Sequence, residues 1–253
     1  MSRATWSLLA SLALITTVLT AGTGNAAPAA EPAHRAGPAY HMPKVGSCHN
    51  LTLRQAMAMS APTTAVDCDE RHTTKTLVVK QLSGKVDWNA PDLWRGVFGP
   101  CARKANRVLG GDKARAMSAF GLFSFIPSKR ERARGAKWKR CELGLWGGRT
   151  LQPLPKNLDL GSPPLDDKVA KCLNGPDRSL RVTVCAKAHT YRVTGGFRLS
   201  GTRYPGEQRL AKKAIDRCPK LVTTRKWRYE VPFNADQWRA GWRTIVCYSK
   251  TKK

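Results

Sequence analysis

The spacing of apolar residues along the chain predicts a small number of helices and strands in a repeated order. Leu210, Ala211, Ala214 and Ile215 have helical spacing and predict a helix over Gly206 to Cys218. A second helix is predicted over 92–109, where two glycines and a proline indicate a break before Cys101. Strands are predicted over 77–79, 119–126, 137–145, 191–197, 227–231 and 242–248. This order predicts an α+β fold class, with short antiparallel sheets that each carry one main helix.

A cysteine motif occurs twice and indicates an internal duplication. Cys68 and Cys185 are each followed, after three residues, by His-Thr. Another cysteine comes 33 residues after each of them, in the helical segments. A proline, a glycine and a last cysteine then follow in the same order, as Pro127, Gly135 and Cys141 and as Pro232, Gly241 and Cys247. So many landmarks in one order predict two tandem copies of one module.

The two copies set the predicted domain boundaries. The first module covers 43–149, a semi-extended linker rich in proline covers 150–164, and the second module covers 165–253. The first copy has extra residues around 56–64 and around 110–115. Because insertions are best tolerated at the surface, both are predicted to be surface loops.

The N-terminus predicts export. Arg3 precedes an uncharged apolar run from Trp6 to Ala21, and Gly24-Asn25-Ala26 then offers the small residues that a signal peptidase reads. We expect a signal peptide over 1–26, followed by a flexible lead-in over 27–42. The alternative is a membrane anchor, for which the run is short, since a span needs about 20 residues. Cleavage leaves a secreted or wall-associated protein with no transmembrane segment.

The eight cysteines form two sets of four, and their spread along an exported chain favours disulfides over a metal site. Four cysteines allow three pairings. We favour pairing the first with the second, on neighbouring strands, and the third with the fourth, where a terminal strand packs under a helix. The favoured pairs are Cys48–Cys68, Cys101–Cys141, Cys172–Cys185 and Cys218–Cys247.

These motifs resemble the septum-formation domain family of secreted and membrane-attached actinobacterial proteins. The resemblance rests on Val45-Gly46-Ser47-Cys48, on the Cys-x3-His-Thr motif and on the segment Trp238 to Arg243 before Cys247. It covers nearly the whole mature chain, once per copy. Arg71 and Ala188 stand where the family has proline before the histidine, and Arg132 replaces the tail tryptophan of the first copy. The resemblance implies a link to cell division and implies no established reaction.

Few residues of the chain are candidates for catalysis or metal binding. His72 and His189 are the only matched histidines, and we expect each to bond the backbone beside its disulfide rather than to act in catalysis. His34, His41 and His49 are expected to lack partners, and no acidic pair recurs at matching positions in both copies. The sequence has no GxSxG motif and no phosphate-binding loop. We therefore expect no enzyme activity, no cofactor and no metal.

Charge is the strongest indication of a partner. The chain has 44 Lys and Arg against 17 Asp and Glu, a net charge of +27, or +26 once Arg3 is removed. Basic residues mixed with tryptophan are typical of surfaces that bind polyanions, although a merely solubilising face is the alternative. The candidate binding residues are Lys129, Arg130, Arg132, Arg134, Lys137, Trp138, Lys139, Arg140, Lys212, Lys213, Arg225, Lys226, Trp227, Arg228, Trp238, Arg239, Trp242 and Arg243.

Together these features predict a secreted, strongly basic and non-enzymatic cell-envelope protein that attaches to anionic wall polymers or other polyanions. Two alternatives remain open. One is a secreted hydrolase of wall polymer or nucleic acid, which requires convergent acids or histidines in a cleft around His72 or His189. The other is a protein-interaction scaffold, in which the paired modules hold an envelope protein.

Overall fold

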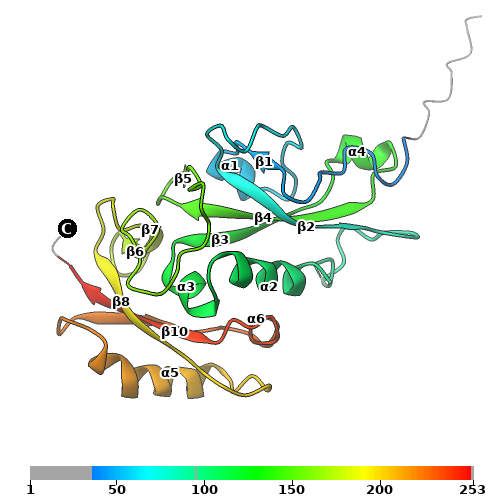
Figure 1. The fold of residues 1–253 in the computed structure, drawn as a ribbon. Helices are drawn as coiled ribbons and strands as arrows, with labels where there is room; N and C mark the ends of the chain where they lie inside the picture. Colours follow the sequence, from blue (N-terminus) through cyan, green and yellow to red (C-terminus); the bar gives the residue numbers. More distant parts are fainter. Residues whose placement is uncertain (1–35, 95, 252–253) are drawn as a thin grey trace, which may run out of the picture. The chain divides into compact units, whose positions relative to one another are not determined.

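The computed structural model describes residues 36–94 and 96–251, so the predicted signal peptide and residues 27–35 of the lead-in lie outside the described residues. Two antiparallel sheets form the framework (Figure 1). The first sheet has the order β1 (Cys48–His49), β2 (Thr74–Gln81), β4 (Trp138–Trp146) and β3 (Phe120–Phe125), and β5 (Leu151–Gln152) also pairs with β4. The second has the order β7 (Arg181–Val184), β6 (Lys171–Asn174), β8 (Tyr191–Arg198), β10 (Thr244–Lys250) and β9 (Trp227–Glu230).

The helices are short, and the two longest are the ones that carry or adjoin a disulfide cysteine. They are α1 (Leu53–Ala56), α2 (Phe98–Val108), α3 (Asp112–Met117), α4 (Lys129–Ala133), α5 (Glu207–Arg217) and α6 (Ala235–Arg239), and a 3₁₀ turn covers Cys218–Lys220. The predicted break before Cys101 lies earlier than expected, because α2 includes Gly99 and Pro100 in its first turn. Proline is tolerated there, since the first N–H groups of a helix have no intrahelical acceptor. The α+β fold class is confirmed, and the two sheets fit two modules.

The two sheets have the same strand order once matched strands are compared. An isolated bridge between Cys48 and Val66 stands beside β1, where the second sheet has β7 beside β6. The central pairs β2–β4 and β8–β10 also share a β-bulge, at Leu77 in the first sheet and at Thr194 in the second. The four disulfides are the pairs favoured from the sequence, and they occupy matching places in the two sheets.

Alternation along the central strands assigns each sheet face to a different core. In β10, Ile245 and Cys247 pack with α5, whereas Val246 and Tyr248 belong to the largest core cluster. In β4, Cys141 and Leu143 also face that cluster. It includes residues of α2, α3 and both sheets. Thus α2 and α3 fill a layer between the two sheets, while α5 covers the outer face of the second sheet (Figure 1).

The insertion at 110–115 is not the surface loop that the sequence predicted. It forms α3, in which Asp112 and Arg115 are 8% exposed and Met117 is 5% exposed. Gly110 and Gly111, both with positive φ, turn the chain from α2 into α3. α3 lies against β8 and β10, and a bridge between Ser118 and Ala170 continues the contact. The extra residues of the first module thus bury one face of the second.

The other insertion, around 56–64, lies over the opposite face of the first sheet. Leu51, Phe123 and Phe125 form a small core beneath it. The buried guanidinium of Arg140 donates to the carbonyls of Ala61 and Pro62, at 3.3 and 2.8 Å. The loop remains exposed on its outer side, as predicted for an insertion.

Parts of the predicted lead-in and linker are held in place by specific contacts. The indole Nε1 of Trp138 donates to the carbonyl of Tyr40 at 2.9 Å, and the N–H of Lys137 donates to Pro38 at 2.9 Å. Residues 37–42 are therefore not a free lead-in. In the linker, Leu151–Gln152 forms β5, and Leu154 is buried in the large core.

Candidate functional site

The first basic stretch divides into an exposed helix and a buried strand. Trp138 and Arg140 have no exposed surface, and Lys139 is 5% exposed with its ammonium donating to the carbonyl of Leu93. Burial lowers the pKa values of Lys139 and Arg140. A side chain without access to solvent cannot reach a polymer at the surface, so these three residues are left out of the candidate surface.

The helix α4 is the exposed part of that stretch. Lys129, Arg130 and Arg134 are exposed on it, and a capping box between Ser128 and Glu131 starts the helix. Arg132 is half-buried and lies over the ring of Trp88, 5.1 Å from its centroid. Lys137, also half-buried, donates to the carbonyl of Gly84. The structure therefore presents a small basic patch here.

The second basic stretch is more exposed and more continuous. α5 buries Leu210 and Ala214 against the second sheet and turns its other side outward. The candidates Lys212, Lys213, Arg225, Lys226 and Arg228 are all exposed, and Trp227 is half-buried. Sequence reasoning did not name three further exposed basic residues of the same stretch, which are Arg209, Arg217 and Lys220.

The tryptophan-rich tail packs inward. Trp238 is 1% exposed and donates from its indole to the carbonyl of Gly201. Trp242 is half-buried between Phe98 and the guanidinium of Arg115, which lies 4.0 Å from the ring centroid. Arg243 lies over the ring of Trp238 and donates to its carbonyl. Trp238 and Trp242 thus serve packing between α6 and its neighbours.

Arg239 is the exposed member of the tail group. Its guanidinium pairs with Asp236 one turn earlier on α6, at 2.5 Å. The tail therefore contributes one basic side chain to the surface, Arg239, whose charge Asp236 compensates, and it contributes no exposed aromatic ring.

The matched histidines have matched structural roles. Nδ1 of His72 lies 2.8 Å from the carbonyl of Glu70, and Nδ1 of His189 lies 2.7 Å from the carbonyl of Lys187. Both rings are buried beside the first disulfide of their sheet. Each histidine thus bonds the backbone two residues earlier, as predicted.

His49 differs from the prediction, because it has several partners. Its ring is fully buried, with Nδ1 3.0 Å from the carbonyl of Thr64 and Nε2 close to the hydroxyls of Ser47 and Thr76. Nε2 also lies 3.5 Å from Glu142, whose carboxylate pairs with Arg140 at 3.1 Å. In the sequence, His49 lies near a segment predicted to be flexible, so no local pattern indicated these partners. His41, also expected to lack a partner, lies 3.2 Å from Glu131, and His34 lies outside the described residues.

A second polar cluster lies at the edge of the second sheet. The hydroxyl of Tyr248 donates to Glu230 at 2.6 Å, and Lys171 pairs with the same carboxylate at 3.2 Å. Burial, and then the Glu230 carboxylate, raise the pKa of Tyr248 well above its ordinary value. Burial opposes ionisation of Glu230, but Lys171 and Tyr248 outweigh it and lower the pKa of Glu230.

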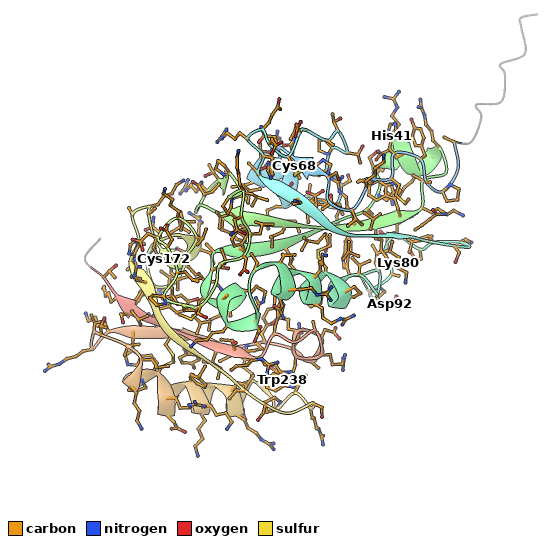
Figure 2. The ribbon with its side chains drawn as sticks, in the orientation of Figure 1. His41, Cys68, Lys80, Asp92, Cys172 and Trp238 are labelled. Carbon is orange, nitrogen blue, oxygen red and sulfur yellow. A yellow bond between two sulfur atoms is a disulfide. The ribbon has the colours of Figure 1, made fainter. Side chains whose placement is uncertain are left out.

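A groove of about 1120 Å³ lies where the two modules meet. On the first-module side it is lined by residues 56–59, by the segment around Asp92 and by Leu122 to Ser124 of β3. On the second-module side it is lined by Phe233 and α6, the helix that carries Trp238 (Figure 2). Neither His72 nor His189 lines this groove.

The described residues contain no candidate metal site and no candidate membrane-spanning helix. Among residues 36–94 and 96–251, no three His, Cys, Asp or Glu side chains are grouped so that they could hold a metal ion. Within the same described part of the chain, no helix has the length and apolar character needed to cross a membrane.

Comparison with known proteins gives one match. The family model for septum formation matches residues 45–247 as a single region that spans both sheets. No curated protein and no solved structure matches this chain. Because the matched region includes all eight cysteines and most of the chain, the chain belongs to the septum formation family.

Proposed function

We propose that this protein is a non-enzymatic component of the cell envelope that attaches to anionic wall polymers through the outer face of α5 and the segment that follows it. Membership of the septum formation family supports a role in cell division or the envelope. The disulfides and the absence of a membrane-crossing helix in the described residues are consistent with that location.

The charge on α5 is the observation that carries the proposal. Over 207–226 the chain has seven basic residues and two acids. All seven basic side chains are exposed, and none of them forms an ion pair with another described residue. They are Arg209, Lys212, Lys213, Arg217, Lys220, Arg225 and Lys226.

A comparison of α5 with its counterpart α2 supports a binding role for the outer face of α5. α2, the counterpart of α5, is covered by α3 and the second sheet. α5 has no such cover in the described structure, and its outer face is predominantly basic, with four exposed basic residues against the two exposed acids Glu207 and Asp216. A like-charged surface repels itself and gains free energy from binding a polyanion, whereas a surface evolved only for solubility normally mixes both signs.

The test is retention on purified cell walls and on a cation exchanger at increasing salt. The variant Lys212→Glu/Lys213→Glu changes the charge of α5 by four, and Lys85→Glu/Lys168→Glu makes the same change at exposed sites elsewhere. We expect the α5 variant to be released from walls at much lower salt than the control variant. Equal loss in both variants would mean that total charge, and not α5, holds the protein on the wall. Retention that is insensitive to salt would refute the proposal altogether.

A further inference from the structure

The edge of the first sheet at β3 lies open in the groove between the modules. β3 pairs with β4 on one side only, and the register runs from Phe120 opposite Leu145 to Phe125 opposite Arg140. Leu122, Phe123 and Ser124 line the groove. The other edge of β3 therefore faces the groove, which residues of α2 and α6 also line.

The hydrogen bonds at the two ends of β3 show which backbone groups point into the groove. The carbonyl of Ala119 accepts from Trp146 of β4, whereas the N–H of Ile126 donates outward to Met59 at 2.9 Å. Successive residues of a strand point their N–H and C=O to opposite sides. Leu122 and Ser124 consequently point their backbone groups away from β4, and those groups have no partner among the described residues.

This edge lacks the features that normally protect an exposed strand. No charged residue occurs between Arg115 and Lys129, in a chain where 24% of residues are charged. The matching edge strand of the second sheet, β9, carries Arg228 and Glu230 in only four residues. Charged residues on an edge hinder its pairing with other chains, so β9 is protected by charge and β3 is not.

The side walls of the groove are apolar and exposed. Met57 and Phe233 are each 64% exposed and Met59 is 54% exposed, although large apolar side chains are usually buried. Met57 and Met59 lie on one side of the β3 edge, and Phe98 at the start of α2 and Phe233 lie on the groove's other walls. Such walls suit the alternating side chains of one added strand.

The charges in the groove favour an occupant that is neutral or acidic. Asp236 pairs with Arg239, and Asp92 interacts with Lys139. Arg103 is exposed in the lining and has no acidic partner among the described residues. Because the edge lies within a groove of about 1120 Å³, we infer that it admits a single extended chain rather than the folded sheet of a second copy.

We propose that the β3 edge binds an extended segment of another protein, which adds to the first sheet as a strand. The segment has apolar residues at alternate positions and an acid that faces Arg103. Its backbone pairs with the N–H and C=O groups of Leu122 and Ser124, and its side chains contact the methionines and Phe233. This inference goes beyond polymer attachment and does not depend on it.

The test uses amide hydrogen exchange of the full mature protein with a designed probe. The probe is an eight-residue peptide of alternating valine and threonine with one central glutamate, and its control is the same peptide N-methylated at every second residue. In the free protein, the amides of Leu122 and Ser124 should exchange rapidly. At a peptide concentration of about ten times its Kd, these amides should exchange about tenfold more slowly, because they exchange only in the protein molecules that have no peptide bound.

A matched pair of variants separates the β3 edge from the rest of the surface. Leu122→Pro removes an outward N–H of β3, and Tyr229→Pro removes an outward N–H of β9. We expect loss of peptide binding only in the β3 variant. If that variant fails to fold, Ser124→Lys replaces it, since it adds a protecting charge at the edge without removing a core side chain.

Several results would overturn the proposal. These are no protection of Leu122 and Ser124 at millimolar peptide, equal binding of the N-methylated peptide, or equal loss in the Tyr229 variant. Protection of the same amides in concentrated protein without peptide, together with dimers in light scattering, would instead assign the edge to a second copy.

Discussion

The carboxylate of Asp112 accepts a hydrogen bond of 2.7 Å from the hydroxyl of Thr244, which joins the inserted helix α3 to the last strand of the second sheet. The same oxygen accepts from the N–H of Arg243 at 3.0 Å, and the other oxygen pairs with Arg115 at 2.8 Å. Asp112 thus satisfies three donors at the boundary between the modules. Burial lowers the pKa of Arg115, while Asp112 opposes that shift and favours the charged guanidinium.

Replacing Asp112 should therefore destabilise the whole protein. Asp112→Ala leaves the hydroxyl of Thr244 without its acceptor and the buried guanidinium of Arg115 without its carboxylate, so that only the side-chain amide of Asn106 still accepts from Arg115. Removing one partner of a buried ion pair costs about 3–5 kcal/mol of the free energy of unfolding, which urea unfolding measures. Asp216→Ala removes an exposed acid from α5 and should change that free energy by less than about 0.5 kcal/mol. Similar small losses in both variants would show that Asp112 does not join the modules.

The shared core predicts that the second module is unstable by itself. Val193, Val246 and Tyr248 face α2 and α3, so residues 165–253 alone would expose an apolar sheet face that the first module covers. We expect this fragment to lack a cooperative unfolding transition and to bind a dye specific for apolar surface. The full mature chain should show one transition with both modules. A fragment with a sharp transition of its own would contradict the idea of a shared core.

Much of the framework follows from sequence spacing, because the periodic signals are strong there. The matched cysteines, His72 and His189 indicated the same strands and the same local contacts that the structure contains. The insertion at 110–115 was misjudged for a physical reason. Its residues include Asp112, Lys113 and Arg115, and a polar composition usually indicates solvent. Lys113 is exposed, but Asp112 and Arg115 pair with each other, and Asp112 also accepts from Thr244, on a strand more than a hundred residues away.

For the candidate binding surface, the sequence predicted the types of residue but not which of their side chains are exposed. Trp138, Arg140 and Trp238 share the basic and aromatic character of exposed binding residues, yet they are buried, because both faces of β4 are covered and α6 packs Trp238 inward. No local sequence pattern indicated the groove, because its lining residues Met59, Leu122 and Phe233 come from three separate segments. An edge without charges, between Arg115 and Lys129, was the one feature that sequence alone could have shown.

Stability should fall at alkaline pH through Tyr248. Its folded pKa is raised by burial and by Glu230, so folding favours the protonated phenol. That contribution is complete below the unfolded pKa of about 10 and is lost as pH rises above it, at up to about 1.4 kcal/mol per pH unit. Urea unfolding of the wild type and of Tyr248→Phe between pH 8 and pH 11 measures it. The difference in unfolding free energy between them should shrink above pH 10.

A surface tyrosine provides the control for this pH dependence. Tyr229 lies on β9 and is 38% exposed. Tyr229→Phe should follow the wild-type pH curve, because its phenol is accessible to solvent in the folded state. If Tyr248→Phe and the wild type kept a constant difference up to pH 11, the Tyr248–Glu230 contact would not favour the protonated phenol.

The buried pair of Arg140 and Glu142 should show strong coupling. Both side chains are fully buried and lie 3.1 Å apart, so each compensates a charge that would otherwise be isolated in the core. Arg140→Leu should lower the free energy of unfolding by about 3–5 kcal/mol, and adding Glu142→Leu should recover part of that loss. The four proteins of this double-mutant cycle, compared by urea unfolding, give the coupling energy directly.

The ion pair of Arg239 and Asp236 is the matched control, because both side chains are more than two-thirds exposed. Water screens such a pair, so its coupling energy should be about 0–1 kcal/mol. The Glu142 carboxylate also accepts from the hydroxyl of Thr76 at 3.3 Å and lies 3.5 Å from His49, so Glu142→Leu alone also removes these contacts, and only the coupling energy of the full cycle reports on the pair with Arg140. Additive losses at Arg140 and Glu142 would mean that the carbonyls of Ala61 and Pro62 hold the guanidinium without help from the carboxylate.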